Sequence, residues 1–330
     1  MFEIFMYTVN AVLPILLLVA LGYELKKIKI VPNHFYKQLN KVTFHVFLPV
    51  LLFHNIYKIE SLRDINAQGL LWCLCGIVLL VAAGMLILPF IPQRNQRGVL
   101  IQCSFRSNYA IVGIPLAAVL GGEKAVAFAS VVSAFSIPIY NALAVIFLTI
   151  YSDDKKSVHF RSLLTDILKN PLIQGVAAGV AVLLFRAMVP SGAFWLKNTL
   201  PFVTDTVGDI AVIGSPLALI VLGAQFDFQV VRQLWKQITL GVTMRLIVSP
   251  MIGILGAVAC NALGIFHLTS TEYPAFIALF ATPVAVSSAV MASEIGGDDR
   301  LAGQLVVWTS LFSMVSLFVI IFTLRSTGIL

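Results

Sequence analysis

Apolar residues along this chain form long runs that are separated by short polar stretches. A helix needs roughly 20 apolar residues to cross a bilayer core of about 30 Å, and the runs have about that length. The pattern therefore predicts an all-α integral membrane protein with about ten transmembrane helices. The predicted spans are residues 5–25, 36–57, 67–91, 98–120, 124–150, 170–189, 200–224, 234–263, 273–295 and 301–325.

The composition agrees with a chain whose polar surface is confined to loops and ends. Hydrophobic residues make up 59% of the 330 residues, and charged residues only 11%, against roughly 25% in soluble domains. The net charge of +7 is spread over the chain without a basic block, so we expect the bilayer rather than nucleic acid as a partner. All four cysteines lie in apolar runs, which argues against a disulfide framework. We expect no metal and no cofactor.

Positive charge at the ends of the spans predicts the orientation of the chain. Glu3 precedes the first apolar run, and Lys26, Lys27 and Lys29 follow it, which is the reverse of a cleaved secretory signal. Over the whole chain, most loop Lys and Arg residues fall on the side of these lysines. Cytoplasmic loops carry the excess of Lys and Arg, so we expect both termini on the non-cytoplasmic side.

The chain divides into two halves of five predicted spans. Residues 151–169 form the most hydrophilic segment, and we expect a cytoplasmic loop there between residues 1–150 and residues 170–330. An odd number of spans in each half gives the halves opposite orientations, as in inverted-topology repeats. At an offset of 175 residues, the pair Gly121-Gly122 matches Gly296-Gly297, and an acidic residue follows each pair.

Helix-breaking residues interrupt the fourth and the ninth predicted span. Pro115 and Pro283 each lack an N–H and clash with the carbonyl four residues earlier, and Gly113 tolerates unusual backbone angles. An ordinary proline kink in each span is the simpler explanation of these residues. Interrupted spans at corresponding places in two halves, however, indicate the binding site of a secondary transporter. The candidate substrate-binding residues are Arg106, Ser107, Asn108, Tyr109, Gly113, Pro115, Thr282, Pro283, Ser287 and Ser288.

Arg106 is the most informative of these residues. It follows Gly98 by eight positions, about 12 Å along a helix, and therefore lies near the middle of the membrane. A guanidinium there costs about 3 kcal/mol or more unless it faces the bundle or a cavity. Its planar fork suits a carboxylate. The alternatives are contact with an anionic substrate and a permanent salt bridge to a structural acid.

Other ionisable residues within spans are candidates for ion coupling or for structural roles. Asp205 and Asp209 share one helix face and are candidates for ion coupling, although the start of their span also suits the headgroup region. His45 is a further candidate for proton coupling. For Arg245 in the eighth span, we favour a structural role. No phosphate loop, dinucleotide fingerprint, zinc-protease motif or nucleophile elbow occurs, so we do not expect an enzyme.

The stretch from Arg106 to Leu116 resembles the first crossover of the auxin efflux carrier family, in its short bacterial form, which includes malate and malonate permeases. That family's pattern is Asn-x-Gly-x-x-Gly-x-Pro-Leu, and Ala110 here replaces a glycine. Further similar pieces are Phe47-Leu48-Pro49, Lys169-Asn170-Pro171, Pro216-Leu217 and Gly296-Gly297-Asp298. The resemblance covers nearly the whole chain.

The resemblance implies ten helices in two inverted five-helix repeats, with broken and crossing fourth and ninth helices, similar to NhaA and the bile-acid symporters. Spans 1, 2, 6 and 7 would form a scaffold that dimerises, and spans 3–5 and 8–10 a transport domain that moves by an elevator mechanism. The implied location is the bacterial inner membrane. The implied cargo is a small carboxylate, either malate-like or malonate-like, or an auxin-like acid.

Two departures from plant carriers limit the analogy. The long hydrophilic middle loop of those carriers is absent, and no asparagine stands beside Pro283, so a two-asparagine auxin site is not expected. The leading hypothesis is a secondary carrier of small organic anions. The alternatives are a sodium-coupled symporter of the bile-acid type, and a membrane sensor that has kept a carrier fold without transport.

Overall fold

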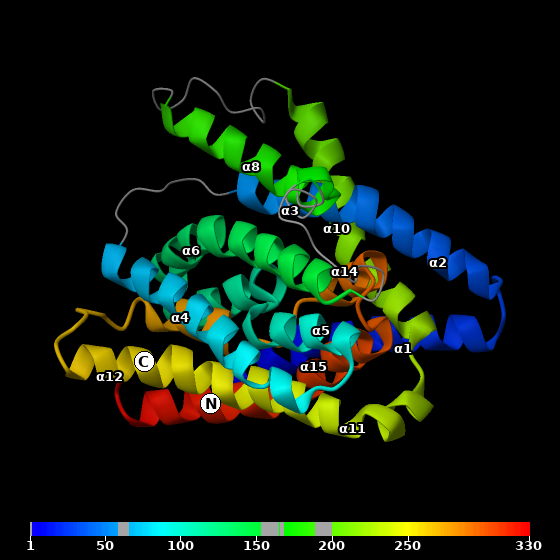
Figure 1. The fold of residues 1–330 in the computed structure, drawn as a ribbon. Helices are drawn as coiled ribbons and strands as arrows, with labels where there is room; N and C mark the ends of the chain where they lie inside the picture. The colour runs from blue at the N-terminus through cyan, green and yellow to red at the C-terminus, as the bar shows by residue number, and fades with distance from the viewer. Residues whose placement is uncertain (1, 59–65, 153–164, 166–167, 189–199) are drawn as a thin grey trace.

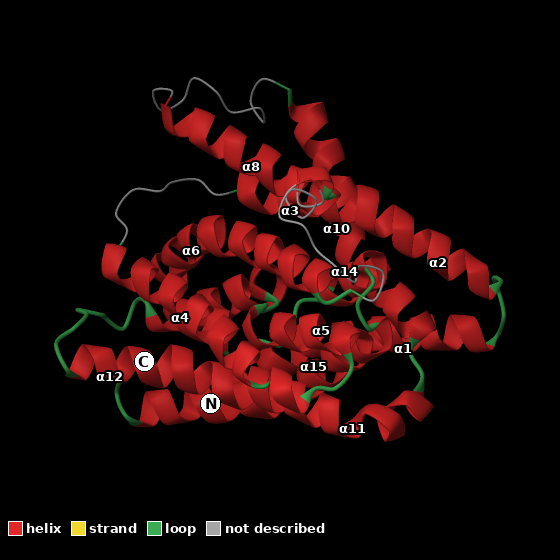
Figure 2. Ribbon diagram, in the orientation of Figure 1, coloured by secondary structure: helices red, strands yellow, loops and turns green. Residues whose placement is uncertain are grey.

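The computed structural model describes residues 2–58, 66–152, 165, 168–188 and 200–330, and its regular secondary structure over these residues is entirely helical (Figure 2). Within this described part of the chain, five helical segments are long and apolar enough to cross a membrane: Ala67–Phe90, Tyr109–Ile150, Pro201–Gln225, Phe228–Ala262 and Asp299–Ser326. The predicted all-helical fold is thus confirmed over the described residues. Its division into two inverted five-helix repeats stays a prediction, and most of the predicted loop 151–169 lies outside the described residues.

The described residues of the first half form six α-helices together with short π and 3₁₀ segments. They are α1 (Phe2–Lys27), α2 (Asn33–Val42), η1 (Thr43–Phe47), α3 (Leu48–Tyr57), α4 (Ala67–Leu86), η2 (Leu88–Phe90), α5 (Arg94–Phe105), η3 (Tyr109–Gly113) and α6 (Ile114–Ile150).

The second half has a similar order of long and interrupted helices. They are α8 (Pro171–Met188), α10 (Pro201–Gln225), α11 (Phe228–Thr243), η4 (Met244–Val248), η5 (Met251–Leu255), α12 (Gly256–Ala262), α13 (Tyr273–Phe280), α14 (Ser287–Ile295) and α15 (Asp299–Ser326).

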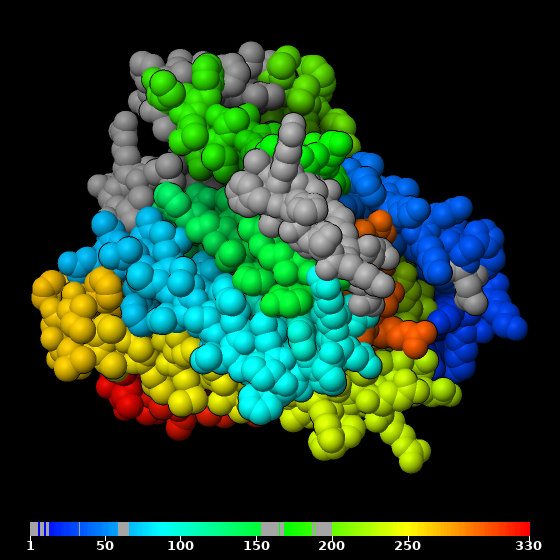
Figure 3. Space-filling view, viewed as in Figure 1, coloured from blue at the N-terminus to red at the C-terminus, as the bar shows by residue number. Residues whose placement is uncertain are grey.

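The helices pack in two groups. Helix α3 packs against α8 and α10, and α1 runs along α10. Helices α5 and α13 pack against α6, and α11 packs along α15. Figure 1 shows α2, α3, α8 and α10 on the upper side, and α4, α5, α6 and α11–α15 below them. In the space-filling view, α4 and α5 form the front surface of the lower group, with α11 and α12 along its lower edge (Figure 3).

The contact between α1 and α10 depends on two glycines that face each other's helix. A Cβ atom at Gly22 would collide with the backbone of Ile220, and a Cβ atom at Gly223 would collide with the backbone of Val19. Small residues allow the backbones of membrane helices to approach closely, which increases van der Waals contact where no hydrophobic effect acts between helices. Gly22 and Gly223 therefore fix how closely α1 and α10 cross.

Two helices of the lower group are interrupted where the sequence carries its breaks. Helix α5 ends at Phe105 and η3 begins at Tyr109, whereas α13 ends at Phe280 and α14 begins at Ser287. Every residue of α13 is buried. The first interruption lies at Arg106–Asn108, well before Pro115, which is the second residue of α6 and directly follows the π segment η3.

A glycine with positive φ ends the second part of each interrupted helix. Gly122 has φ 64° and ψ −154° and separates two helical parts of α6, and Gly296 has φ 89° at the C-terminus of α14. Side chains with a Cβ rarely adopt such angles. The two Gly-Gly-acid sequences therefore mark the turns that lead out of the interrupted helices.

Candidate functional site

The two helix interruptions lie against each other. The backbone N–H of Asn108 donates to the carbonyl of Pro283 at 2.8 Å, and the N–H of Ala285 donates to the carbonyl of Arg106 at 3.3 Å. Ser107 and Val284 form an isolated antiparallel bridge between these two bonds. Backbone groups without helical partners must find others at membrane depth, and here the two interruptions satisfy one another.

Arg245 closes the C-terminal ends of both preceding helices. Its Nη2 donates to the carbonyl of Leu279 at 2.8 Å, its Nε to that of Thr282 at 2.8 Å, and its Nη1 to that of Ser104 at 3.2 Å. The residue is fully buried. The last carbonyls of a helix lack partners and carry partial negative charge, so one guanidinium neutralises the ends of α5 and α13. This geometry supports the structural role predicted for Arg245.

Arg106 contacts neutral groups in the described structure. Its Nη2 donates to Asn141 Oδ1 at 2.9 Å and to Ser287 Oγ at 2.8 Å, and its Nη1 contacts the sulfur of Met291. The side chain is only 2% exposed. Among the described residues, the recorded ion pair joins Lys27 to Glu24, so no described carboxylate balances the charge of Arg106.

Asn141 is held so that its oxygen faces Arg106. Its Nδ2 donates to the carbonyl of Ile137 one turn earlier in α6, at 2.8 Å. The amide donor is thereby used, and the Oδ1 atom is left for the guanidinium. Because Arg106, Asn141 and Ser287 come from the first interruption, from α6 and from α14 respectively, this cluster joins three elements.

A cavity of about 60 Å³ lies beside Arg106, and we call it the crossing cavity. Residues of α3 and α10 from the upper group, and of α6 and the two interruptions from the lower group, line it. Its lining residues are Leu48, Leu51, Leu52, Asn55, Arg106, Ser107, Asn108, Tyr109, Ala110, Ile111, Ile137, Tyr140, Asn141, Ser215, Ala285, Val286 and Ser287.

The polar groups of this cavity include an unpaired hydrogen-bond donor. Asn108 Nδ2 is buried and has no hydrogen-bond partner in the structure. Ser107 Oγ lies 3.4 Å from Tyr140 Oη, and Tyr109 Oη donates to the carbonyl of Ala129 at 3.0 Å. The first turns of η3 and α14 begin at the cavity with Tyr109 and Ser287, and helix N-termini favour anions. No Asp or Glu is among the residues that line it.

Half of the predicted substrate-binding residues line this cavity. Arg106, Ser107, Asn108, Tyr109 and Ser287 do so. The other predicted residues are Gly113, Pro115, Thr282, Pro283 and Ser288, and none of them is in the lining.

Three of those five residues make contacts that hold the backbone of the interruptions in place. The Thr282 hydroxyl donates to the carbonyl of Ala278 at 2.7 Å, and the Pro283 carbonyl accepts from Asn108. A Cβ atom at Gly113 would meet the carbonyl oxygen of Ala278 at 3.0 Å, so this glycine lets η3 approach α13.

The predicted coupling residues also lie away from the crossing cavity. Asp205 and Asp209 are exposed on α10, and His45 is exposed, with its Nδ1 2.8 Å from the carbonyl of Lys41. None of the three lines the cavity. Within the described part of the chain, no group of three or more His, Cys, Asp or Glu residues is placed to hold a metal ion.

Tyr140, Ser215, Asn55 and Asn141 line the cavity although the sequence did not single them out as binding residues. Asn55 and Asn141 are polar positions within predicted spans, which helix–helix hydrogen bonding explains equally well. Only the folded chain shows that these two amides face the same cavity as Arg106.

A buried arginine in a cavity between two paired helix interruptions, within an all-helical apolar chain, is typical of membrane transporters. The sequence profile of the membrane transport protein family matches residues 7–321. The chain therefore belongs to this family, that of the auxin efflux carriers. It is also 24% identical, over 323 residues, to a protein described as an uncharacterized transporter from Methanothermobacter thermautotrophicus, with 95% of this chain and 97% of that protein covered.

Proposed function

We propose that this protein is a secondary transporter of small organic anions that binds the substrate carboxylate at Arg106. The observation that carries the proposal is the buried Arg106 guanidinium, which lines the crossing cavity and has no carboxylate partner among the described residues. A buried charge without a counter-ion is costly. A carboxylate bound in the cavity would supply that counter-ion and would fit the planar fork of the guanidinium.

The electrostatic arrangement around the cavity supports an anion rather than a cation. Arg245 neutralises the carbonyl ends of α5 and α13, whereas the N-terminal turns of η3 and α14 start at the cavity. The partial positive charges of these turns add to the charge of Arg106. Asn108 Nδ2 is a further donor without a partner, and it would bind a second oxygen of the substrate.

The size of the cavity favours the smaller of the candidate substrates. Its volume of about 60 Å³ suffices for a few waters and is well below the roughly 300–1,000 Å³ of pockets for drug-sized ligands. Malonate-like and malate-like acids require less expansion of the cavity than an aromatic acid or a bile acid. We therefore place malonate and malate ahead of auxin-like acids.

The two helix groups suggest how the substrate crosses the membrane. Helices α1–α3, α8 and α10 would form the scaffold and dimer interface, and α4–α6 with α11–α15 the transport domain, in two inverted repeats. The crossing cavity lies between α3 and α10 on one side and the interruptions on the other, as an elevator mechanism requires. The expected location is the bacterial inner membrane, with both termini on the non-cytoplasmic side.

Sodium coupling at the helix interruptions is disfavoured by Arg245. In transporters with broken helices, unwound carbonyls and half-helix C-termini coordinate the coupling cation. Here the carbonyls of Ser104, Leu279 and Thr282 already accept hydrogen bonds from the guanidinium. We therefore propose that Arg245 acts as a resident cation in place of a sodium ion, which argues against the bile-acid type of symporter.

Flux of labelled malonate and malate into proteoliposomes tests the proposed function. We expect saturable flux in the wild type, and its loss in Arg106→Ala. The matched control is Arg232→Ala, because Arg232 is an exposed arginine on α11. Binding of malonate by folded protein without any flux would instead support the sensor, and neither binding nor flux for a broad panel of carboxylates would contradict the proposal.

A further inference from the structure

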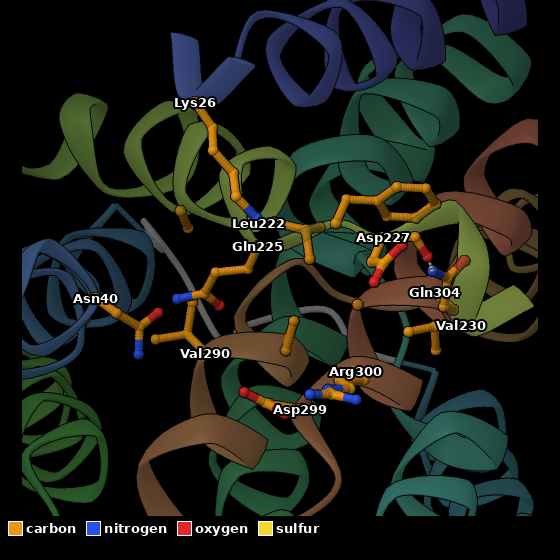
Figure 4. A pocket seen from close by; sticks show the side chains of 14 residues that line it. Lys26, Asn40, Leu222, Gln225, Asp227, Val230, Val290, Asp299, Arg300 and Gln304 are labelled. Atoms are coloured by element: carbon orange, nitrogen blue, oxygen red, sulfur yellow. Dashed lines mark hydrogen bonds between the residues drawn. The ribbon is translucent and has the colours of Figure 1, made fainter. Parts of the chain in front are cut away.

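A second cavity, which we call the outer cavity, opens between the two helix groups near the end of α1 that carries Lys26 (Figure 4). Its volume is about 180 Å³. Helices α1, α2 and α10 form one side of it, and the N-terminal parts of α11 and α15 with α14 form the other. The charge pattern of the sequence predicts that this end of the molecule faces the cytoplasm.

The outer cavity and the crossing cavity follow the same helix–helix interface. On α10, Ser215 lines the crossing cavity, and Ala218, Leu222 and Gln225 line the outer one. Successive positions are three or four residues apart, so they lie on one face of the helix. Helices α10 and α14 are in contact. The two cavities are therefore successive parts of one groove.

The same succession occurs on α14. Val286 and Ser287 line the crossing cavity, and Ala289 and Val290 line the outer one. A separation of three residues is about 4.5 Å along a helix. Near the start of α14, the residues that line the two cavities are thus less than one helical turn apart.

That separating layer is apolar and made partly of small residues. Ala218, Leu222, Ala289 and Val290 are all buried. Two of the four are alanines, so a small relative shift of α10 and α14 would open a connection. No buried hydrogen bond between these four side chains would have to break.

The two acids that line the outer cavity each lie at the N-terminus of a helix. Lys26 and Arg300 line it together with Asp227 and Asp299. Asp227 caps α11, because its Oδ1 accepts from the N–H of Gln229 at 2.8 Å, and Asp299 lies in the first turn of α15. Both acids therefore offset the positive N-terminus of a helix.

Of the two cations, Arg300 interacts electrostatically with the neighbouring Asp299, whereas Lys26 lies across the cavity from it. In the described chain the recorded ion pair is that of Lys27 with Glu24, and neither Lys26 nor Arg300 takes part in one. Figure 4 shows the Lys26 side chain extending into the cavity toward Leu222 and Gln225, with Arg300 on the opposite side beside Asp299. The four formal charges of the lining cancel, so the attraction of an anion depends on how Lys26 and Arg300 face the cavity and not on a net positive charge.

We propose that the outer cavity is the mouth through which the substrate anion reaches Arg106, and that Lys26 and Arg300 form a first binding position for its carboxylate there. This proposal rests on the proposed function. The amides of Gln225 and Gln304 supply further polar contacts in the mouth, although Gln304 is partly used: its Nε2 donates to the carbonyl of Asp227 at 2.9 Å and its Oε1 accepts from the indole of Trp308 at 3.0 Å. The substrate then passes the layer of Ala218, Leu222, Ala289 and Val290 to enter the crossing cavity.

Charge-selective labelling of cysteines tests the mouth without requiring transport. Cys75 and Cys260, which are not buried, are replaced by serine, and the buried Cys73 and Cys103 are kept. Single cysteines are then placed at Gln225 in the outer cavity and at Ser287 in the crossing cavity. The reagents are an anionic sulfonatoethyl and a cationic trimethylammonioethyl methanethiosulfonate, and each rate is divided by the reagent's rate with free cysteine.

We expect the anionic reagent to react faster than the cationic one at both positions. The double substitution Lys26→Gln with Arg300→Gln should lower this preference by about tenfold, the lower end of the range over which steering by charge changes association rates. Removal of two charges elsewhere, by Lys27→Gln with Arg232→Gln, should leave the preference nearly unchanged. An equal reduction by both double variants, or by neither, would overturn the role of Lys26 and Arg300.

The path between the cavities is tested by narrowing the layer. The two variants are Leu222→Trp and, at a different point of the layer, Ala218→Phe. Each should slow labelling at Ser287 by about tenfold, because interiors have little free volume. Labelling at Gln225 should be nearly unaffected. Undiminished labelling at Ser287 in both folded variants would show that anions take another route. Because labelling does not depend on malonate flux, these results stand even if the proposed substrate is wrong.

Discussion

The backbone N–H of Asn108 donates to the carbonyl of Pro283 at 2.8 Å, which joins two helix interruptions that lie 175 residues apart in the sequence. This bond and its partner from Ala285 to Arg106 let two unwound segments satisfy each other inside an apolar bundle. The consequence is a fixed position for the side chains of Arg106 and Asn108. Both residues line the crossing cavity.

The charge and the shape of Arg106 should contribute separately to transport. Arg106→Lys keeps a positive charge but loses the planar fork that binds a carboxylate with two parallel bonds. We expect Arg106→Lys to retain weak flux with a raised KM, and Arg106→Ala to lose flux entirely. Initial rates over a range of malonate concentrations measure both. Equal activity of the lysine variant and the wild type would show that only charge matters.

We expect Asn141 to affect substrate affinity by positioning the side chain of Arg106. Asn141→Leu removes the oxygen that accepts from Nη2 at 2.9 Å, and a buried donor without a partner costs about 1–3 kcal/mol. The freed guanidinium should bind substrate with altered affinity, so we expect a shift of about tenfold in the dissociation constant for malonate, measured by calorimetry on the solubilised protein. In the Arg106→Ala background the same substitution should have no further effect, and an additional loss there would mean that Asn141 contacts the substrate itself.

Arg245 should matter for stability more than for binding. In Arg245→Met, the carbonyls of Ser104, Leu279 and Thr282 lose their donor, and each unsatisfied group costs about 1–3 kcal/mol. We expect a marked fall in the unfolding temperature of the detergent-solubilised protein. For a second variant, Arg245→Gly, millimolar guanidinium ion should restore part of the lost stability, because it can occupy the vacated position. A stability equal to that of the wild type would contradict the capping role.

Replacement of sodium should leave transport unchanged. If Arg245 takes the place of a coupling cation, malonate flux at a fixed membrane potential will be the same in sodium and in N-methylglucamine buffers. The measurement is initial uptake into proteoliposomes clamped with potassium and valinomycin. Uptake that requires sodium would contradict the resident-cation proposal and would restore the symporter alternative.

The crossing of α1 and α10 should not tolerate larger side chains. Gly22→Leu or Gly223→Leu would place a side chain where the backbone of the other helix lies, and overpacking of this kind costs about 1–3 kcal/mol or more. We expect a lower unfolding temperature for either variant. Leu17→Ala is the control, because Leu17 is an exposed position on the same helix at 60% exposure, and a comparable loss there would mean that α1 is sensitive to any change.

Much of the architecture could be predicted from the sequence, because hydrophobic runs and helix breakers act locally. The apolar runs predicted an all-helical chain, and the paired Gly-Gly-acid sequences marked the turns at Gly122 and Gly296. Arg106 could be recognised as a candidate site residue, since a charged residue in an apolar run has few explanations. The exact position of the first interruption could not be predicted from the sequence, because a proline such as Pro115 fits the start of a helix as well as it breaks one.

By itself, then, the sequence determined the all-helical fold class, the family and the two interruptions that line the crossing cavity. The tertiary structure decided which polar groups share the cavity: it placed Asn141, Tyr140, Asn55 and Ser215 beside Arg106 and left Asp205, Asp209 and His45 on exposed surfaces. It also assigned the two buried arginines to opposite environments, Arg245 to helix carbonyls and Arg106 to a cavity. The physical reason is that hydropathy and proline chemistry depend on neighbours in the chain, whereas the partner of a buried charge depends on which segments meet in space.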